Sequence, residues 1–517
     1  MWAKKNIFFL TAILILVFNP ASAQFYNFPS DISFSLITER QLSVKDSAVH
    51  AGVKPYIHFF SSQYAHVADS HRVFKSSGHK ATINLIFNKH LVAIESKQQN
   101  FKLRLDPLVN FEGGRDLSDT SGRNLYSNTR GFIASGYIGK KFYFETLLAE
   151  NQSFFPTYIS NSAKATLVVP GQGRWKTFKL TGYDYAFSSG FISVQPLKNL
   201  NIQLGHGKQK IGNGYRSLLL SDNAFNYPYA RITQQWFRGR VQYNNIYAVF
   251  MNLVPAAIVQ NLGAERLFQK KAASFQYLSV NAAKFLNLGF FQGLIWEAGD
   301  SKNRQHLDLQ YYNPLIYTNL LSYHLNNKNN IVAGGDFKLK LHNEFNIYGQ
   351  IMLDDLKNTS KKGNGWGFQT GFNYFNVLGI INLFLQAEIN YVAESSYLSP
   401  VGSVSDQSYS HYNQNIAYTP GSGKELMVTG DYKWRRFFMN VKYNLQVHEA
   451  SYLKDNFTTN FYNAKIGYVV NSAYNLNISL GINYRMQNFY TFKGSNEQTN
   501  YIYFGLKTSL YNLYYDF

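Results

Sequence analysis

The sequence has no cysteine, and only 15% of its 517 residues are charged. The missing thiols exclude disulfide bonds, thiolate metal sites and a cysteine nucleophile. Long apolar runs are also missing beyond the N-terminus, where no stretch approaches the roughly 20 residues that a membrane-spanning helix needs. Neither a disulfide framework nor a helical membrane bundle therefore fits the chain.

The first residues form a strongly apolar segment of another kind. Lys4 and Lys5 precede an apolar run from Ile7 to Phe18, and Ala21-Ser22-Ala23 fits a small-residue cleavage site. This order is typical of a secretory signal peptide. Residues 1–23 therefore predict export, with residues 24–517 as the mature chain.

Aromatic residues and positive charge are abundant. Aromatics make up 17% of the chain, with 39 Tyr and 42 Phe, and the net charge is +20. Aromatic girdles are typical of strands that face lipid on one side and water on the other. A soluble array of β-sandwiches is the alternative. The charge favours lipopolysaccharide or an acidic glycan as a neighbour, and export argues against nucleic acid.

From Phe101 onward, apolar and polar residues alternate with a period of two. The clearest examples are Ile381–Tyr391, Phe437–His448 and Leu476–Met486. Segments of about 9–11 residues with two such faces match tilted membrane-crossing strands. Short turns and long loops alternate between them, which predicts about 18 antiparallel strands. The expected fold is all-β: a transmembrane outer-membrane barrel over residues 101–517.

The remaining parts of the chain complete this layout. Residues 24–100 predict a small periplasmic or lumen-plugging region, with a short helix at Ile32–Ile37. An even strand count places both termini on the periplasmic side and the long loops outside. The terminal Tyr514-Tyr515-Asp516-Phe517 is the kind of aromatic end that such barrels present to their assembly machinery. We expect a monomer in the outer membrane.

The segment Asn201–Phe250 illustrates the repeating unit. Ile202 and Leu204 are expected to face lipid, with Asn201 and Gln203 facing the lumen. A long loop follows the first strand, and Arg238-Gly239-Arg240 forms a tight turn. The loop either contributes an exposed binding surface or folds inward as a constriction.

The long loops combine aromatic, basic and amide side chains. Sugars stack on aromatic rings, while Asn, Gln and Arg hydrogen-bond their hydroxyls or carboxylates. The alternative is that these loops pack their own aromatics at the barrel mouth. The candidate glycan-binding residues are Arg174, Trp175, Tyr215, Arg216, Tyr229, Arg231, His411, Tyr412 and Gln414.

Several basic residues share the inward-facing parity. A basic lumen would favour anions, whereas pairing with Asp336 or Glu388 would give these residues a structural role. The predicted basic lumen lining is Lys338, Lys340, Lys442, Lys465, Arg485 and Lys507.

Catalytic motifs are missing from the sequence. No HExxH, close-spaced metal pair or GxSxG is found among its residues. Gly212-Asn213-Gly214 lacks the strand–helix context of a phosphate-binding loop. We expect no enzyme activity, no cofactor and no metal site.

Three segments carry a family resemblance: GNGYRSLLLSDNAFNYPYARI at 212–232, LDLQYYNPLIYTN at 307–319, and HYNQNIAYTPGSGKELMVTGDYKWRRF at 411–437. Together they resemble the capsule-assembly Wzi family, and more closely its gliding-motility RemB-like surface branch. The resemblance implies an 18-stranded outer-membrane barrel plugged by N-terminal helices. It also implies lectin-like attachment of surface polysaccharide, or adhesion during gliding.

Two functional hypotheses follow. The first is a non-enzymatic outer-membrane barrel that binds or anchors surface polysaccharide through its extracellular loops. The alternative is a porin-like channel or transporter for small anionic solutes. The expected partners are outer-membrane lipid and lipopolysaccharide, surface polysaccharide and the barrel assembly machinery.

Overall fold

The structure is a computed structural model. It describes residues 36, 39–40, 43, 49–57, 86–96, 98, 100–139, 141–255, 268–298, 309–323, 329–354, 365–399, 406–448, 456–490, 496–509 and 511–517. The predicted signal peptide at 1–23 lies outside the described residues. No helix among the described residues is long and apolar enough to cross a membrane.

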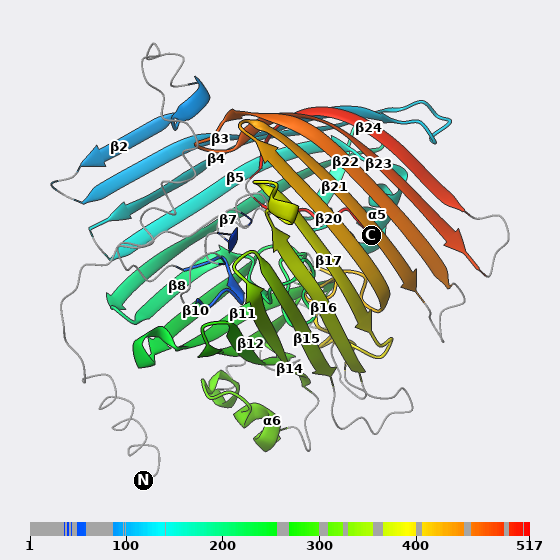
Figure 1. The fold of residues 1–517 in the computed structure, drawn as a ribbon. Helices are drawn as coiled ribbons and strands as arrows, with labels where there is room; N and C mark the ends of the chain where they lie inside the picture. The colour runs from blue at the N-terminus through cyan, green and yellow to red at the C-terminus, as the bar shows by residue number, and fades with distance from the viewer. Residues whose placement is uncertain are drawn as a thin grey trace, which may run out of the picture.

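A closed ring of 18 antiparallel strands dominates the fold (Figure 1). In chain order the ring strands are β3 (Phe101–Asp116), β4 (Asn124–Ile138), β5 (Phe142–Phe154), β7 (Gly182–Leu197), β8 (Leu200–Gly207), β10 (Tyr227–Trp236), β11 (Val241–Pro255), β12 (Phe268–Ala283), β13 (Leu286–Glu297), β14 (Asn330–His342), β15 (Phe345–Asp354), β16 (Gly365–Phe375), β17 (Leu383–Val392), β20 (Gly423–Trp434), β21 (Phe437–His448), β22 (Phe457–Asn471), β23 (Leu476–Phe489) and β24 (Glu497–Thr508).

Smaller elements occupy the connections. These are β1 (Val53–Lys54), β2 (Val92–Ser96), α5 (Thr157–Thr166), β6 (Trp175–Phe178), β9 (Lys210–Ile211), η1 (Phe237–Gly239), η2 (Leu309–Tyr312), α6 (Thr318–Tyr323), η3 (Val377–Gly379), β18 (Ser410–His411) and β19 (Gln414–Asn415). The predicted fold class and strand number are confirmed.

The last ring strand closes the barrel against the first. β24 pairs with β3 from Tyr501↔Asp116 to Lys507↔Asn110. Closure is needed because an unpaired backbone N–H or C=O in hydrocarbon costs several kcal/mol. β2 pairs with the first residues of β3, from Phe101 to Leu105, so strand pairing begins before the predicted boundary at residue 101.

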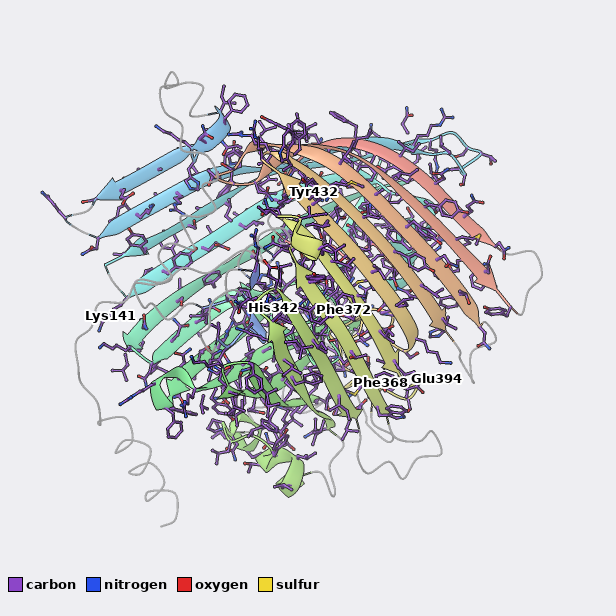
Figure 2. The ribbon with its side chains drawn as sticks, in the orientation of Figure 1. Lys141, His342, Phe368, Phe372, Glu394 and Tyr432 are labelled. Carbon is purple, nitrogen blue, oxygen red and sulfur yellow. The ribbon has the colours of Figure 1, made fainter. Side chains whose placement is uncertain are left out.

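The two faces of the wall differ as the sequence pattern predicts. On β8, Ile202 and Leu204 are exposed on the outer face, whereas Asn201 and Gln203 are buried inside. The outer face also carries Phe368, which Figure 2 labels on β16. An apolar outer surface suits lipid, because hydrocarbon offers no hydrogen bonds to polar side chains.

The two rims of the barrel have different connections. At the short-turn rim, Arg238 and Gly239 adopt positive φ values of 58° and 82° in the predicted tight turn between β10 and β11. Figure 2 shows Lys141 and His342 at this rim, and Glu394 at the opposite, long-loop rim. Tight turns of this kind need left-handed backbone, which glycine adopts readily.

Several described segments fill the lumen. We call residues 212–226 the lumen loop, residues 407–419 the lumen hairpin and residues 511–517 the lumen tail. The lumen loop and the lumen hairpin pack with inward-facing strand residues in a buried apolar cluster that includes Leu218, Leu219, Tyr409, Ile416 and Phe275. Tyr514 of the lumen tail packs in a smaller cluster with Tyr215 and Met427. An 18-stranded barrel is wide enough for an aqueous channel unless segments such as these occupy it.

Part of the N-terminal region also lies in the lumen. β1 pairs with β9 through Val53↔Ile211, immediately before the lumen loop. His50 is held at the wall by Ser279 Oγ at 2.8 Å and by the Gly239 carbonyl at 2.8 Å. These described residues therefore lie inside the barrel.

Candidate functional site

The lumen loop is anchored by polar side chains on the wall. Glu388 on β17 accepts the main-chain N–H groups of Tyr215 at 2.7 Å and Arg216 at 3.1 Å. Gly214 allows this approach, because a Cβ there would lie 2.4 Å from Glu388 Oε2. Gly212 has a φ of 134°, a value that residues with side chains rarely adopt. The two glycines thus let the backbone dock against the strands.

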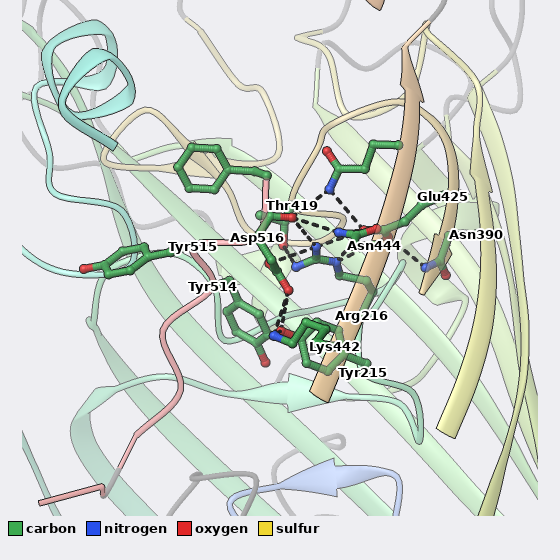
Figure 3. Close-up of polar contacts among 12 residues, drawn as sticks. Tyr215, Arg216, Asn390, Thr419, Glu425, Lys442, Asn444, Tyr514, Tyr515 and Asp516 are labelled. Carbon is green, nitrogen blue, oxygen red and sulfur yellow. Dashed lines mark hydrogen bonds and ion pairs between the residues drawn. The ribbon is translucent and has the colours of Figure 1, made fainter. Parts of the chain in front are cut away.

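Arg216 lies at the centre of a buried ionic network (Figure 3). Its Nη2 is 2.9 Å from Glu425 Oε1 on β20 and 3.0 Å from Asp516 Oδ1 in the lumen tail. Lys442 Nζ on β21 donates to Asp516 Oδ2 at 3.0 Å, and the Tyr215 hydroxyl donates to the same oxygen at 2.6 Å. This network joins the lumen loop, the wall and the lumen tail.

The lumen tail has further attachments beyond Asp516. The Tyr514 hydroxyl donates to Asp222 at 2.7 Å, and Arg485 Nε donates to the Phe517 main-chain oxygen at 2.8 Å. Burial alone would raise the pKa of the Asp516 carboxyl. The positive charges of Arg216 and Lys442 have the larger effect and hold this pKa well below its usual value. The carboxylate therefore stays ionised.

The aromatic residues at the end of the chain lie beyond the final strand. The last ring strand ends at Thr508, and the chain then turns into the lumen. Phe517 packs edge-on against Tyr158 of α5, with ring centroids 5.7 Å apart. The alternation of polar and apolar residues could not predict this turn, because the tail is bound by side chains from distant strands.

A cavity of about 440 Å³ lies at the long-loop rim, beside the lumen tail. We call it the rim cavity. It lies between the α5 segment, residues 413–424 and the rim ends of β21, β22 and β23. Its lining includes Asn413, Gln414, Asn415, Thr419, Lys424, Gln446, His448, Phe457, Arg485, Gln487 and Phe517.

The chemistry of the rim cavity suits a polyhydroxylated ligand. The side-chain amides of Gln446 and Gln487 line the cavity. The Gln446 nitrogen already donates to Glu425 and to the Asp516 main-chain oxygen, so its carbonyl oxygen is the acceptor that it brings to the cavity. His448 stacks on Phe457 with centroids 4.9 Å apart and an interplanar angle of 20°. Among the described residues that line the cavity, none is Asp or Glu, whereas Lys424, His448 and Arg485 are present. The lining thus combines amides, aromatic rings and basic groups.

The structure corrects the expected exposure of five loop residues. Tyr215, Arg216, Tyr229, Arg231 and His411 are all buried, with relative exposures between 1% and 7%. The chain itself supplies their partners: the Tyr229 hydroxyl donates to Gln203 at 3.0 Å, and Arg231 Nη1 donates to the Pro55 carbonyl at 3.0 Å. The constriction alternative therefore describes this loop better than an exposed binding surface.

The other four candidates lie nearer the surface. Gln414 lines the rim cavity and accepts the Phe225 N–H at 3.1 Å. Trp175 is half-buried and donates to the Ala163 carbonyl at 2.9 Å. Arg174 is exposed over the Phe268 ring, and Tyr412 is half-buried. The structure does not bring all nine candidates into one site.

The basic lumen residues divide between three places. Lys442, Lys465 and Lys507 line a second cavity of about 270 Å³, which we call the inner cavity. Arg485 lines the rim cavity, while Lys338 is buried on β14 and Lys340 is half-buried nearby. Lys442 has the expected kind of carboxylate partner, although that partner is Asp516 rather than Asp336 or Glu388.

Gln414 and Arg485 were predicted site or lumen residues, but sequence reasoning missed the other residues that make the rim cavity. The alternation over Phe437–His448 predicts the polar face of the strand for Gln446 and His448, without a functional role. They are the last inward-facing residues before a long loop, and this position could have identified them as candidate site residues. Phe457 and Gln487 occupy equivalent rim ends on β22 and β23. The meeting of these ends with residues 413–424 depends on three-dimensional packing.

Among the described residues, no group of three or more His, Asp or Glu is placed so that it could hold a metal ion. The arrangement offers a ligand-sized cavity lined by residues of the wall and the long loops. Its chemistry is that of binding through hydrogen bonds, ring contacts and positive charge.

The closed antiparallel ring with its apolar outer face defines the class: an outer-membrane-type transmembrane β-barrel. No protein-family model matches the sequence, and no curated protein matches it. Among solved structures the fold is similar to Wzi of Escherichia coli, an outer membrane protein involved in group 1 capsule assembly and described as a carbohydrate-binding β-barrel. That likeness has a TM-score of 0.56 at 12% identity and covers 95% of this chain and 100% of Wzi.

Looser likenesses are found to porins. OpdO of Pseudomonas aeruginosa gives a TM-score of 0.44 at 9% identity, covering 79% of this chain and 96% of OpdO. A BenF-like porin of Pseudomonas fluorescens Pf-5 gives 0.45 at 9% identity, covering 79% of this chain and 97% of the porin.

Proposed function

We propose that this protein is an outer-membrane barrel that binds surface polysaccharide at its long-loop rim. The observation that carries the proposal is the rim cavity, whose lining joins amides, aromatic rings and basic side chains. Sugars present hydroxyls to amide groups and C–H faces to aromatic rings. The fold likeness to a carbohydrate-binding barrel supports the same proposal.

The filled lumen favours binding over free passage of solutes. The lumen loop, hairpin and tail pack in buried clusters across the barrel interior. An open porin needs a continuous water-filled path, and the described segments leave separate cavities instead. We therefore rank polysaccharide binding ahead of the porin-like alternative.

We also propose a cellular role and a location for the protein. Capsule attachment and adhesion during gliding would both use a sugar-binding rim, so one surface serves either role. We propose localisation with the long loops outside the cell, where surface polysaccharide and lipopolysaccharide are found. We propose that the protein acts as a monomer.

Glycan binding by purified protein tests this function. Native protein should bind a subset of bacterial polysaccharides on an array, and calorimetry should then give the dissociation constant. Phe457→Ala should weaken binding by about fivefold, since losing one aromatic contact costs about 1 kcal/mol. Gln446→Ala should weaken it as well, through a lost hydrogen bond.

A matched control separates the site from general damage to the rim. Tyr490 is an aromatic residue at the same rim, 66% exposed and outside the described lining of the cavity. Tyr490→Ala should bind like the native protein. Equal binding by Phe457→Ala and Tyr490→Ala would contradict the proposed site. Absence of binding to any polysaccharide would contradict the function itself.

A further inference from the structure

The lumen tail lies between the rim cavity and the inner cavity. Tyr514 and Phe517 line the rim cavity, whereas Tyr515 and Asp516 line the inner cavity. The inner cavity reaches toward the short-turn rim, where Lys433 and Asn475 adjoin the turns of β20 and β23. One short segment therefore has a cavity on each side of it.

The strand β21 shows how close the two cavities lie to each other. Its successive inward-facing residues are Lys442, Asn444 and Gln446. Lys442 lines the inner cavity and Gln446 lines the rim cavity. Asn444 is the inward position between them, and its Nδ2 donates to the Asp516 main-chain oxygen at 2.8 Å. On this strand a single residue separates the two cavities, and the tail covers it.

The strand β23 repeats the arrangement. Asn483 lines the inner cavity, and the next inward residue, Arg485, lines the rim cavity. Arg485 Nε donates to the main-chain oxygen of Phe517 at 2.8 Å. No inward-facing residue lies between these two positions, because side chains alternate along a strand. The tail again marks the boundary.

The contacts that hold the tail are those of an anion site. The Asp516 carboxylate lies 3.0 Å from Arg216 Nη2 and 3.0 Å from Lys442 Nζ, and it accepts the Tyr215 hydroxyl. The same three groups, arginine, lysine and a phenol, can also bind a carboxylate or phosphate ion from solution in place of the Asp516 side chain. Asp516 thus fills a place that a small anion could occupy.

We propose that the lumen tail is a gate, and that its release joins the two cavities into a pathway for small anions. The pathway runs along β21 and β23 from the short-turn rim to the long-loop rim. Withdrawal of Asp516 leaves the basic groups of the network facing the opened space. This function is separate from polysaccharide binding at the rim.

The lining of the inner cavity accounts for the expected selectivity. Four lysines line it, namely Lys433, Lys442, Lys465 and Lys507. Once the tail is withdrawn, the acidic residues of the described lining are Glu112 and Asp431. Glu112 accepts the Tyr501 hydroxyl at 3.0 Å, and Asp431 accepts Asn440 Nδ2 at 2.8 Å. The excess of lysines favours anions over cations.

Conductance across planar lipid bilayers tests the gate. The native protein should be silent, whereas Asp516→Asn and Phe517→Ala should produce discrete openings. In a potassium chloride gradient the reversal potential of these openings should shift toward the chloride equilibrium potential. Lys465→Gln and Lys507→Gln, added together to Asp516→Asn, should reduce that shift. Folding of each variant is checked by heat-modifiable migration on gels.

Controls distinguish gating from damage. Asp119→Asn makes the same chemical change in the loop that follows β3, where Asp119 pairs with Arg123, and it should remain silent. If Asp516→Asn fails to fold, Arg485→Gln offers a second route, because it frees Phe517 and leaves the Arg216 network intact.

A thiol probe locates the pathway. Since the chain has no cysteine, Asn483→Cys introduces a single reactive site in the inner cavity. In the Asp516→Asn background, a methanethiosulfonate reagent should block the openings of this variant and leave the cysteine-free parent conducting. Folded tail variants that stay silent would overturn the proposal. Openings that persist unchanged after the reagent has modified Asn483→Cys would overturn the proposed route.

Discussion

Removing the Arg216 side chain should destabilise the barrel strongly. Arg216→Met keeps the volume of the side chain but removes its charge and all its donors. Arg216 is 1% exposed, and the side chains of Glu425 and Asp516 are 0% and 2% exposed. Breaking a buried ion pair by removing one partner costs about 3–5 kcal/mol, since the other charge is left buried without its partner.

The remaining contacts place the expected loss near the lower limit. Glu425 keeps donors from Asn390 at 3.0 Å and from Asn444 at 2.9 Å. Asp516 keeps Lys442 at 3.0 Å. Neither carboxylate becomes bare, so we expect a loss of about 3 kcal/mol rather than 5. That corresponds to roughly a hundredfold change in the unfolding equilibrium constant.

Urea unfolding in detergent micelles, followed by tryptophan fluorescence, measures this loss. Arg123→Met is the control, because Arg123 pairs with Asp119 at 2.9 Å in a solvent-exposed loop, and exposed pairs contribute about 0.2–1 kcal/mol. The double variant of Arg216→Met with Asp516→Asn should lose less than the sum of the single losses. Equal losses in Arg216→Met and Arg123→Met would refute the reasoning, as would strict additivity with Asp516→Asn.

Two further predictions concern the lumen loop and its surroundings. Gly214→Ala should destabilise the protein by about 1–3 kcal/mol, because its Cβ would lie 2.4 Å from Glu388 Oε2. Gly113→Ala is the control and should be tolerated, because its Cβ would meet no atom within 4 Å. The urea midpoints of the two variants measure the difference in stability. Burial lowers the pKa of the Lys208 ammonium from 10.5 to about 8, so the unfolded chain binds more protons between pH 8 and 10.5. Stability from Lys208 should therefore rise with pH across that window, and Lys208→Met should flatten the rise; a parallel pH profile in both proteins would contradict this.

The wall could be predicted from sequence because its determinants are local. Each strand carries its own alternation, so the pattern over Phe437–His448 reproduces the bounds of β21. The lipid-facing places of Ile202 and Leu204 followed from the same period of two. Closure then requires the ends of the sheet to meet, and the count of short and long connections gave the strand number.

The lumen contents could not be predicted in the same way. Tyr215 and Arg216 are typical of an exposed recognition loop when considered alone. Their burial depends on Glu388, which is 173 residues from Tyr215, and on Glu425, which is 209 residues from Arg216. A single sequence does not show which polar wall residue meets which loop. The direction of the lumen tail depends on the same long-range contacts.

The lumen loop therefore has a different role from the one its composition indicates. A loop rich in tyrosine and arginine at a barrel mouth suggests a ligand surface, but here Arg216 and the carboxylates around it satisfy one another. Because its charges are matched within the chain, the loop needs no external partner to be stable. The groups left for an external ligand are the amides, rings and basic side chains around the rim cavity. In the proposed gate, the ionic network that secures Asp516 also keeps that cavity closed toward the lumen, so closure of the barrel depends on Arg216.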